Sequence, residues 1–364
     1  MQQWRYPLVP GPVKVPASVL AARERDYPSP DLEEEFFLLY ERVQGQLQTI
    51  MGTAPASGGP AIMLGEAMVV LWGAVKSCVA PGDRVLVVST GLFGEGFADM
   101  ARVVGADVRL LAFGDDEAID PARVEGELKA FRPRMVTAVH CETPCGTLNP
   151  VEAVGALLDR YGVDLYLVDA VASIGGAPLN AEAARIDLCL LGSQKCLSAP
   201  PGLSVVAAGP RAWKAAKRVG YRGYDALLPF ERAVEERYFP YTHSWHGIAG
   251  LEEACRLLLD EGLEAAYARH ERVAALCRRC GRELGLELFP RDERANSPTV
   301  TAFKVPERIG WPELNRRLRE RGVAVGGSYG RLAGKVFRIG HMGTQADERL
   351  VSEAMALLGE ALAR

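Results

Sequence analysis

A lysine and an aspartate each follow a predicted strand, at a place where side chains can reach a ligand. Lys195 lies in the stretch "LLGSQKCLSAPPGLS" after an apolar run, and Asp169 ends the run "LYLVD". In an open parallel sheet, ligands bind beyond the carboxyl ends of the strands, so both side chains are expected at one site. A loop lysine is usually solvated and a strand-end aspartate often caps a helix, so the pair indicates chemistry better than either residue alone.

An amine and a carboxylate on neighbouring strand ends suit an imine-forming pyridine cofactor. A partly desolvated lysine has a lowered pKa and attacks an aldehyde to form a Schiff base. A carboxylate held against the ring nitrogen keeps this nitrogen protonated, which makes the ring an electron sink. The stretch "IMLGEAMVVLWGAV" contains a strand, Gly65 and a helix in the order that offers backbone N–H groups to a phosphate. The sequence therefore predicts a phosphorylated pyridine cofactor.

The elements that position these residues alternate between strands and helices. Apolar, β-branched runs predict strands at 84–90, 107–113, 135–140, 164–170 and 187–193. Helical patterns such as "FADMARVVG" and "PVEAVGALLDRYG" lie between most of them. Strands of this kind, separated by helices, predict a mainly parallel sheet that helices cover on both faces.

The C-terminal third of the chain has a different pattern. A long helical stretch at 246–284 precedes strands near 286–289, 299–304 and 335–339, with helices at 311–321 and 345–363. The predicted fold class is α/β, with a large domain and a smaller C-terminal α+β domain. We divide the chain into an extended N-terminal segment at 1–20, a large α/β domain at 21–262 and a small domain at 263–364.

Composition excludes several classes of function. The 364 residues carry a formal net charge of -4, with no basic block and no run of 18 apolar residues. We therefore expect no nucleic acid and no membrane as partner, and a cytoplasmic location. Eight cysteines at irregular spacings favour reduced thiols over a disulfide framework. Cys277 and Cys280 lie in an amphipathic helix without partners at zinc spacing, so no metal is expected.

The chain resembles the class V, fold-type I pyridoxal-phosphate aminotransferases, specifically the alanine–glyoxylate and serine–pyruvate branch. The resemblance runs nearly end to end, and its most specific part is "VDAVASIGG" together with "GSQKCLSAPPG". It also includes "LVPGPVKVP", "VHCETPCGTLNP" and "GKVFRIGHMG". The resemblance implies that an amino group moves from a small amino acid, of the alanine or serine type, to glyoxylate or pyruvate by a ping-pong mechanism. It also implies a homodimer with shared active sites.

The resemblance implies a role for each matching residue. Lys195 would form the Schiff base with pyridoxal 5'-phosphate, and Asp169 would face the pyridine nitrogen. The cofactor pocket would further contain Gly65, Glu66, Ala67, Phe93, Thr143, Val171, Gln194 and, from the neighbouring subunit, Thr242. Phe93 would stack on the ring, and Gln194 would bind the phosphate. Arg338 in "FRIG" would bind the substrate carboxylate, because the fork of donors in a guanidinium suits a bidentate contact.

The chain departs from the family pattern at three places. Glu66 stands where many members have Ser or Thr beside the phosphate, which its negative charge would oppose, so either Glu66 turns away or the register of the resemblance is shifted there. Near the expected substrate entrance, Tyr27-Pro28 replaces a His-Arg pair and His243-Ser244 replaces a proline-containing turn, and these two changes leave the substrate open.

Three other functions compete with this prediction. A 2-aminoethylphosphonate–pyruvate aminotransferase has similar motifs, including "ETPCGTLNP" and "SPTVTAF". A desulfurase or β-lyase of the same fold is disfavoured, because a desulfurase needs a nucleophilic cysteine that "GVAVGGSYGRLAGKVFRIG" lacks. A non-catalytic interaction module would not need Asp169, Lys195 and Arg338 together.

Overall fold

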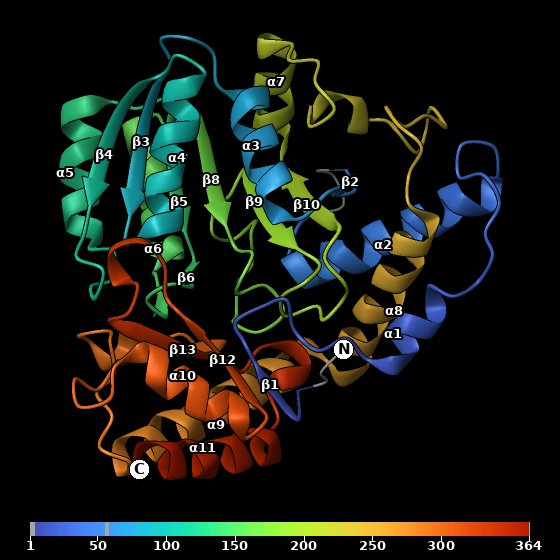
Figure 1. The fold of residues 1–364 in the computed structure, drawn as a ribbon. Helices are drawn as coiled ribbons and strands as arrows, with labels where there is room; N and C mark the ends of the chain where they lie inside the picture. The colour runs from blue at the N-terminus through green and yellow to red at the C-terminus, as the bar shows by residue number, and fades with distance from the viewer. Residues whose placement is uncertain (1–3, 55–57, 364) are drawn as a thin grey trace.

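A seven-stranded sheet organises the larger part of the computed structural model, which describes residues 4–54 and 58–363 (Figure 1). In sheet order the strands are β2 (Ala61–Leu64), β10 (Leu203–Ala208), β9 (Leu188–Gly192), β8 (Leu165–Asp169), β5 (Met135–Val139), β3 (Arg84–Ser89) and β4 (Asp107–Ala112). Strand β10 is antiparallel to both of its neighbours, and all other adjacent pairs are parallel. The predicted mainly parallel α/β sheet is confirmed.

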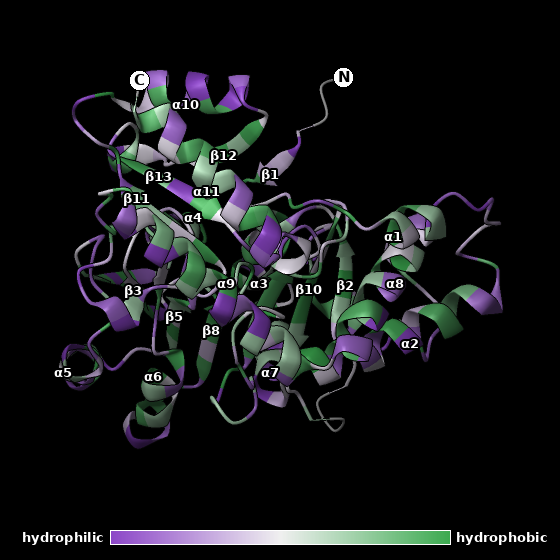
Figure 2. Ribbon diagram, turned by 90° about the horizontal axis from the view of Figure 1, so that it is seen from below, coloured by the Kyte–Doolittle hydropathy of each residue, from purple (hydrophilic) through white to green (hydrophobic). Residues whose placement is uncertain are grey.

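The central strands form because their residues are apolar on both faces. Every residue of β5, β8 and β9 is buried, as expected for parallel strands that helices cover on both sides. The strands near β2 and β10 are coloured as hydrophobic in Figure 2, whereas the helices around them carry both hydrophobic and hydrophilic residues. The helices of this part are α3 (Ala67–Cys78), α4 (Leu92–Val103), α5 (Pro121–Phe131), α6 (Val151–Leu158) and α7 (Pro210–Val219).

A second, four-stranded sheet lies beyond the carboxyl ends of the parallel strands (Figure 1). Its order is β1 (Tyr6–Leu8), β12 (Val323–Gly327), β13 (Val336–Gly340) and β11 (Val300–Lys304). Strand β1 is parallel to β12, so the start of the chain joins the C-terminal sheet. The predicted strand near 286–289 is reduced to an isolated bridge between Leu288 and Phe303. Strands β1 and β12 were not predicted.

The expected long helix at 246–284 is two helices, α8 (Trp245–Glu261) and α9 (Leu263–Glu283). Gly262 separates them with φ of 87°, a left-handed conformation that side chains other than glycine rarely adopt. Division of the chain into domains at Gly262 stays a prediction. The remaining helices are α1 (Ala17–Ala22), α2 (Glu34–Met51), α10 (Trp311–Glu320) and α11 (Glu348–Ala363). Within the described ranges, no helix combines the length and apolar character needed to cross a bilayer.

Candidate active site

A cavity of about 190 Å³ lies at the ends of β5, β8 and β9, on the side of the large sheet that faces the small one. Its lining consists of Glu66, Ala67, Met68, Leu71, Phe93, Cys141, Thr143, Asp169, Val171, Ala172, Gln194 and Lys195. The structure therefore brings most of the predicted cofactor residues together in one cavity. Because they come from the starts of two helices and the ends of three strands, the site exists only in the folded chain.

Lys195 lies three residues after β9 and is held by the N-terminal segment. Its Nζ donates a hydrogen bond of 2.6 Å to the carbonyl oxygen of Pro10. Gly11, with φ of 88°, packs so closely that an added Cβ would meet Lys195 Cδ at 2.6 Å. Burial lowers the pKa of Lys195, and the positive charge of Arg338 acts in the same direction. A lowered pKa makes the amine a better nucleophile near neutral pH.

Asp169 is the last residue of β8 and is buried at the floor of the cavity. One carboxylate oxygen accepts a 2.8 Å hydrogen bond from the Val171 N–H group. Burial raises the pKa of Asp169 to about 6, although this hydrogen bond and the charge of Lys195 act to lower it. A buried carboxylate with this environment favours a cationic partner such as a protonated ring nitrogen.

Glu142, which the sequence analysis did not assign to the site, holds the start of α4. It is fully buried, and its two carboxylate oxygens accept hydrogen bonds from the N–H groups of Phe93, at 2.9 Å, and Gly94, at 3.1 Å. Burial raises the pKa of Glu142 to about 7, while these two bonds act to lower it. The carboxylate thereby orients Phe93, which lines the cavity. Its position directly after a predicted strand end was the signal that could have identified it.

At the start of α3, the carboxylate of Glu66 occupies the place where backbone N–H groups could otherwise bind an anion. Glu66 caps the helix, and its side chain accepts a 3.0 Å hydrogen bond from the Met68 N–H group. The Gly65 N–H group donates to the carbonyl of Gly202 at 2.9 Å. Gln194 Nε2 lies 3.4 Å from the Glu66 carboxylate, whereas its buried Oε1 has no hydrogen-bond partner within the described ranges. Glu66 therefore faces the cavity and does not turn away.

Arg338 is a buried cation beside the cavity. It lies on β13, and its guanidinium donates to the carbonyl oxygens of Gly327, at 3.0 Å from Nε, and of Thr143, at 3.4 Å from Nη1. The ring of Tyr329 covers it at 4.7 Å. Among the described residues no carboxylate forms an ion pair with Arg338. Because a buried charge is costly without a counter-ion, the position favours an anionic ligand.

Two predicted cofactor residues do not line the cavity: Gly65, which adjoins Glu66 in the lining, and Thr242, which lies apart. Thr242 is exposed, and its hydroxyl donates a 2.8 Å hydrogen bond to Asp31. It is absent from the residues that line the cavity. Its predicted role from a neighbouring subunit stays a prediction.

Comparison with known proteins decides the family. Residues 65–338 match the family model described as aminotransferase class V. The chain belongs to the class V aminotransferase family. It is 36% identical to a pyridoxamine–pyruvate transaminase of Mesorhizobium japonicum, over 98% of this chain and 91% of the relative. It is 31% identical to an alanine–glyoxylate aminotransferase of Oryctolagus cuniculus, with coverage of 98% and 92%.

Solved structures agree with this assignment. The crystal structure of pyridoxamine–pyruvate aminotransferase from Mesorhizobium loti superposes with a TM-score of 0.95 at 34% identity, and covers 100% of this chain and 94% of that one. The fold is therefore that of a fold-type I aminotransferase, as predicted. The chain is a pyridoxal-phosphate-dependent transaminase by family, which confirms the predicted enzyme class and cofactor.

The cavity fits the ring of this cofactor better than its phosphate. Asp169 suits the ring nitrogen, Lys195 suits the aldehyde, and the unpartnered Oε1 of Gln194 leaves a buried acceptor open to a ligand donor. At the start of α3, however, the N–H group of Met68 is already bonded to Glu66. A negative side chain thus lies in the place where helix N–H groups would otherwise bind an anion.

Proposed function

We propose that this aminotransferase transfers an amino group to a small 2-keto acid, pyruvate or glyoxylate. The observation that carries the proposal is the buried Arg338, which has no acidic partner in the described part of the chain and lies close enough to Lys195 to lower its pKa. A carboxylate bound by Arg338 would hold the rest of a small keto acid near the Lys195 amine.

Each of the polar and aromatic residues at the site would have its own role in the reaction. When bound, pyridoxal phosphate supplies an aldehyde that condenses with amines and a protonated ring that withdraws electrons. Asp169 would keep the ring nitrogen protonated, and Phe93 would hold the ring flat. Lys195 Nζ would accept the proton that leaves the α-carbon of an amino-acid donor and deliver it, within the same half-reaction, to the carbon that carried the aldehyde; in the second half-reaction it would move a proton in the opposite direction. The charge of Arg338 orients each carboxylate substrate in turn.

The amino donor has two candidates. By resemblance the donor is a small amino acid such as alanine or serine, with pyridoxal phosphate retained between turnovers. A second candidate, pyridoxamine as donor, is supported by Glu66 together with the likeness to pyridoxamine–pyruvate transaminase. A carboxylate at the start of α3 would repel a phosphate, but would accept a hydrogen bond from the 5'-hydroxyl of an unphosphorylated pyridoxamine.

Absorbance titration separates the donors. The purified protein is titrated with pyridoxal phosphate and with pyridoxal, and each form is then mixed with alanine, serine, 2-aminoethylphosphonate or pyridoxamine. An amino-acid transaminase binds pyridoxal phosphate tightly and is bleached by its donor. Tighter binding of pyridoxal, with pyruvate consumed at the expense of pyridoxamine, supports the second candidate. No spectral change with either aldehyde contradicts the proposed function.

Variants at Glu66 sharpen this test. Glu66→Ser keeps a helix-capping oxygen but removes the charge, so we expect tighter binding of pyridoxal phosphate by about tenfold or more. Asp120→Ser is the matched control, because Asp120 caps α5 through the Ala122 N–H group in the same way but lies outside the cavity. If Glu66→Ser leaves the ratio of the affinities for pyridoxal phosphate and pyridoxal unchanged, Glu66 does not select between these two ligands.

We also propose a cytoplasmic homodimer in which Thr242 contacts the site of the partner. Two large side chains are exposed around Thr242: Leu32, at 81% exposure, follows Asp31, the hydrogen-bond partner of Thr242, and Tyr238, at 62% exposure, lies four residues before it in the chain. Sedimentation equilibrium measures the mass in solution, and a monomer at micromolar concentration would contradict this part of the proposal.

A further inference from the structure

The segment between β12 and β13 carries one of the groups that contact Arg338 and starts directly after another. This connector, residues 328–335, begins after Gly327, whose carbonyl accepts from the Arg338 guanidinium. Tyr329, in the connector, covers the same guanidinium with its ring at 4.7 Å. The connector therefore lies against the arginine that is proposed to bind the substrate carboxylate.

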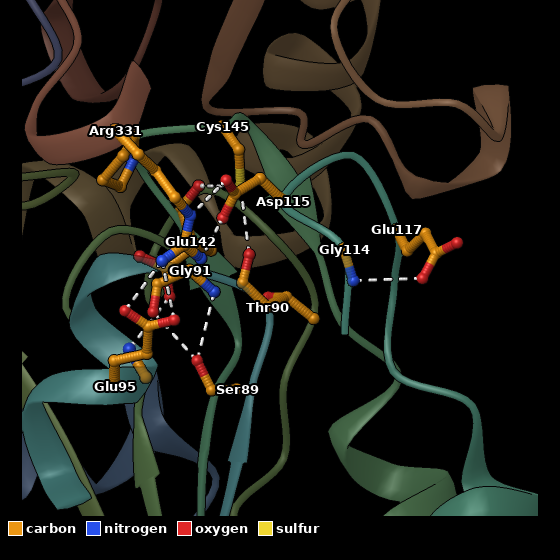
Figure 3. A network of polar contacts seen from close by, with 12 residues as sticks. Ser89, Thr90, Gly91, Glu95, Gly114, Asp115, Glu117, Glu142, Cys145 and Arg331 are labelled. Atoms are coloured by element: carbon orange, nitrogen blue, oxygen red, sulfur yellow. Dashed lines mark hydrogen bonds and ion pairs between the residues drawn. The ribbon is translucent and has the colours of Figure 1, made fainter. Parts of the chain in front are cut away.

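Arg331 ties the middle of the connector to the large sheet. Its Nη1 donates to both carboxylate oxygens of Glu95, at 2.8 and 2.9 Å, and its Nε and Nη2 form a bidentate contact with Asp115 (Figure 3). Glu95 lies in the first turn of α4, and Asp115 follows β4. Exposed ion pairs usually contribute little, but a network that includes a bidentate contact has the defined geometry that fixes a position.

The same turn of α4 also bears Phe93. Glu142 accepts hydrogen bonds from the N–H groups of Phe93 and Gly94. Glu95, the next residue, contacts Arg331 (Figure 3). One rigid helix start therefore contacts both the aromatic side chain of the cavity and the connector that carries Tyr329.

We propose that Arg331 is a positioning residue for the keto-acid carboxylate. It holds the connector against α4 and Asp115, so that Gly327 and Tyr329 keep the Arg338 guanidinium aimed at the substrate. The inference rests on the proposed keto-acid specificity. Ser328, which donates a 2.8 Å hydrogen bond to the carbonyl of Pro144, fixes the start of the connector, and Arg331 fixes its middle.

The test compares Arg331→Gln with Arg291→Gln. Arg291 also contacts carboxylates of the loop after β4, Asp116 at 3.2 Å and Glu117 at 2.8 Å, but lies outside the connector. Both variants remove the same charge at neighbouring points. For Arg331→Gln we expect a five- to tenfold rise in the KM for pyruvate, with kcat and the melting temperature close to those of Arg291→Gln. Arg331→Lys, which retains the charge without the fork, should give an intermediate KM.

Hydrogen exchange provides a readout that does not depend on turnover. Peptides from the connector should exchange faster in Arg331→Gln than in wild type or Arg291→Gln. Equal KM values for the two glutamine variants, or unchanged exchange in the connector, would overturn the inference. If the wild-type enzyme does not use pyruvate or glyoxylate with any donor, the proposed function fails and the substrate role of Arg331 fails with it, while the exchange data still decide whether Arg331 anchors the connector.

Discussion

Replacing Asp169 with asparagine should stabilise the ligand-free protein while impairing the enzyme. Burial raises the pKa of Asp169 from 3.8 to about 6, so the folded chain resists its ionisation. This difference corresponds to a cost of about 3 kcal/mol in the free energy of unfolding once the group is fully charged. Asparagine avoids that cost, and its side-chain oxygen can still accept the hydrogen bond from the Val171 N–H group.

The pH dependence of this stabilisation follows from the pKa of Asp169 in the unfolded chain, 3.8, and in the folded chain, about 6. Between pH 3.8 and about 6 the folded chain binds the proton more tightly than the unfolded chain, so the stability of wild type falls as pH rises. The advantage of Asp169→Asn should therefore grow with pH, by about 1.5 kcal/mol between pH 5 and pH 8. Urea unfolding of the ligand-free proteins at these two pH values measures it.

Asp83→Asn is the control, because folding lowers the pKa of Asp83 and raises that of Asp169. Burial raises the pKa of Asp83, but hydrogen bonds from Arg218 and from the Ala80 N–H group outweigh it and leave this pKa below 3.8. Its contribution is lost only as pH falls through that lower value, so the difference between Asp83→Asn and wild type should stay constant from pH 5 to pH 8. A constant difference for Asp169→Asn as well would refute the reasoning. With ligand present, Asp169→Asn should lower kcat by about 10- to 150-fold, since a charged hydrogen bond contributes about 1.5–3 kcal/mol.

Three further substitutions test the site. Lys195→Ala should reduce kcat by at least about a thousandfold while ligand absorbance is retained, because the proton-transfer group is lost; near-normal turnover would remove Lys195 from the mechanism. Arg338→Lys should raise the KM for pyruvate about tenfold or more with little change in the melting temperature, because one ammonium cannot replace the fork; an unchanged KM would contradict carboxylate binding there. Gly11→Ala should lower kcat about tenfold, because its Cβ would displace Lys195, whereas Gly285→Ala, with a similar φ of 75° and no neighbour within 4 Å, should affect only stability; equal kcat values for the two variants would dismiss the contact.

The sequence predicted the central parallel strands of the large sheet well because these strands are apolar on both faces, but it did not predict β10. The expected strands at 135–140, 164–170 and 187–193 coincide with β5, β8 and β9 to within two residues at each end. Asp169 and Lys195 then follow from the rule that ligands bind beyond strand ends. Asp169 and Lys195 meet in one cavity because the strands before them end at the same edge of the sheet. The alternation of strands and helices in the sequence indicates this arrangement.

Elements that depend on distant partners escaped prediction. Strand β1 has three residues, including Pro7, and forms only because β12 lies beside it. The carbonyl of Pro10 contacts Lys195 across 185 positions, and no local pattern encodes such a contact. From the sequence alone, Arg331 is likewise expected to be an ordinary surface arginine, because its two carboxylate partners lie on other elements.

The pairing of β1 with β12 has a consequence for biosynthesis. The segment around Pro10 leaves the ribosome before β12 does, and its docking site on β12 emerges only after the whole large sheet has been made. Domains generally fold in the order of synthesis, so the sheet that bears Lys195 can form while the N-terminal segment is still free. The contact between Pro10 and Lys195 is therefore among the last to close, and a nascent chain released before Val323 leaves its reactive amine uncovered.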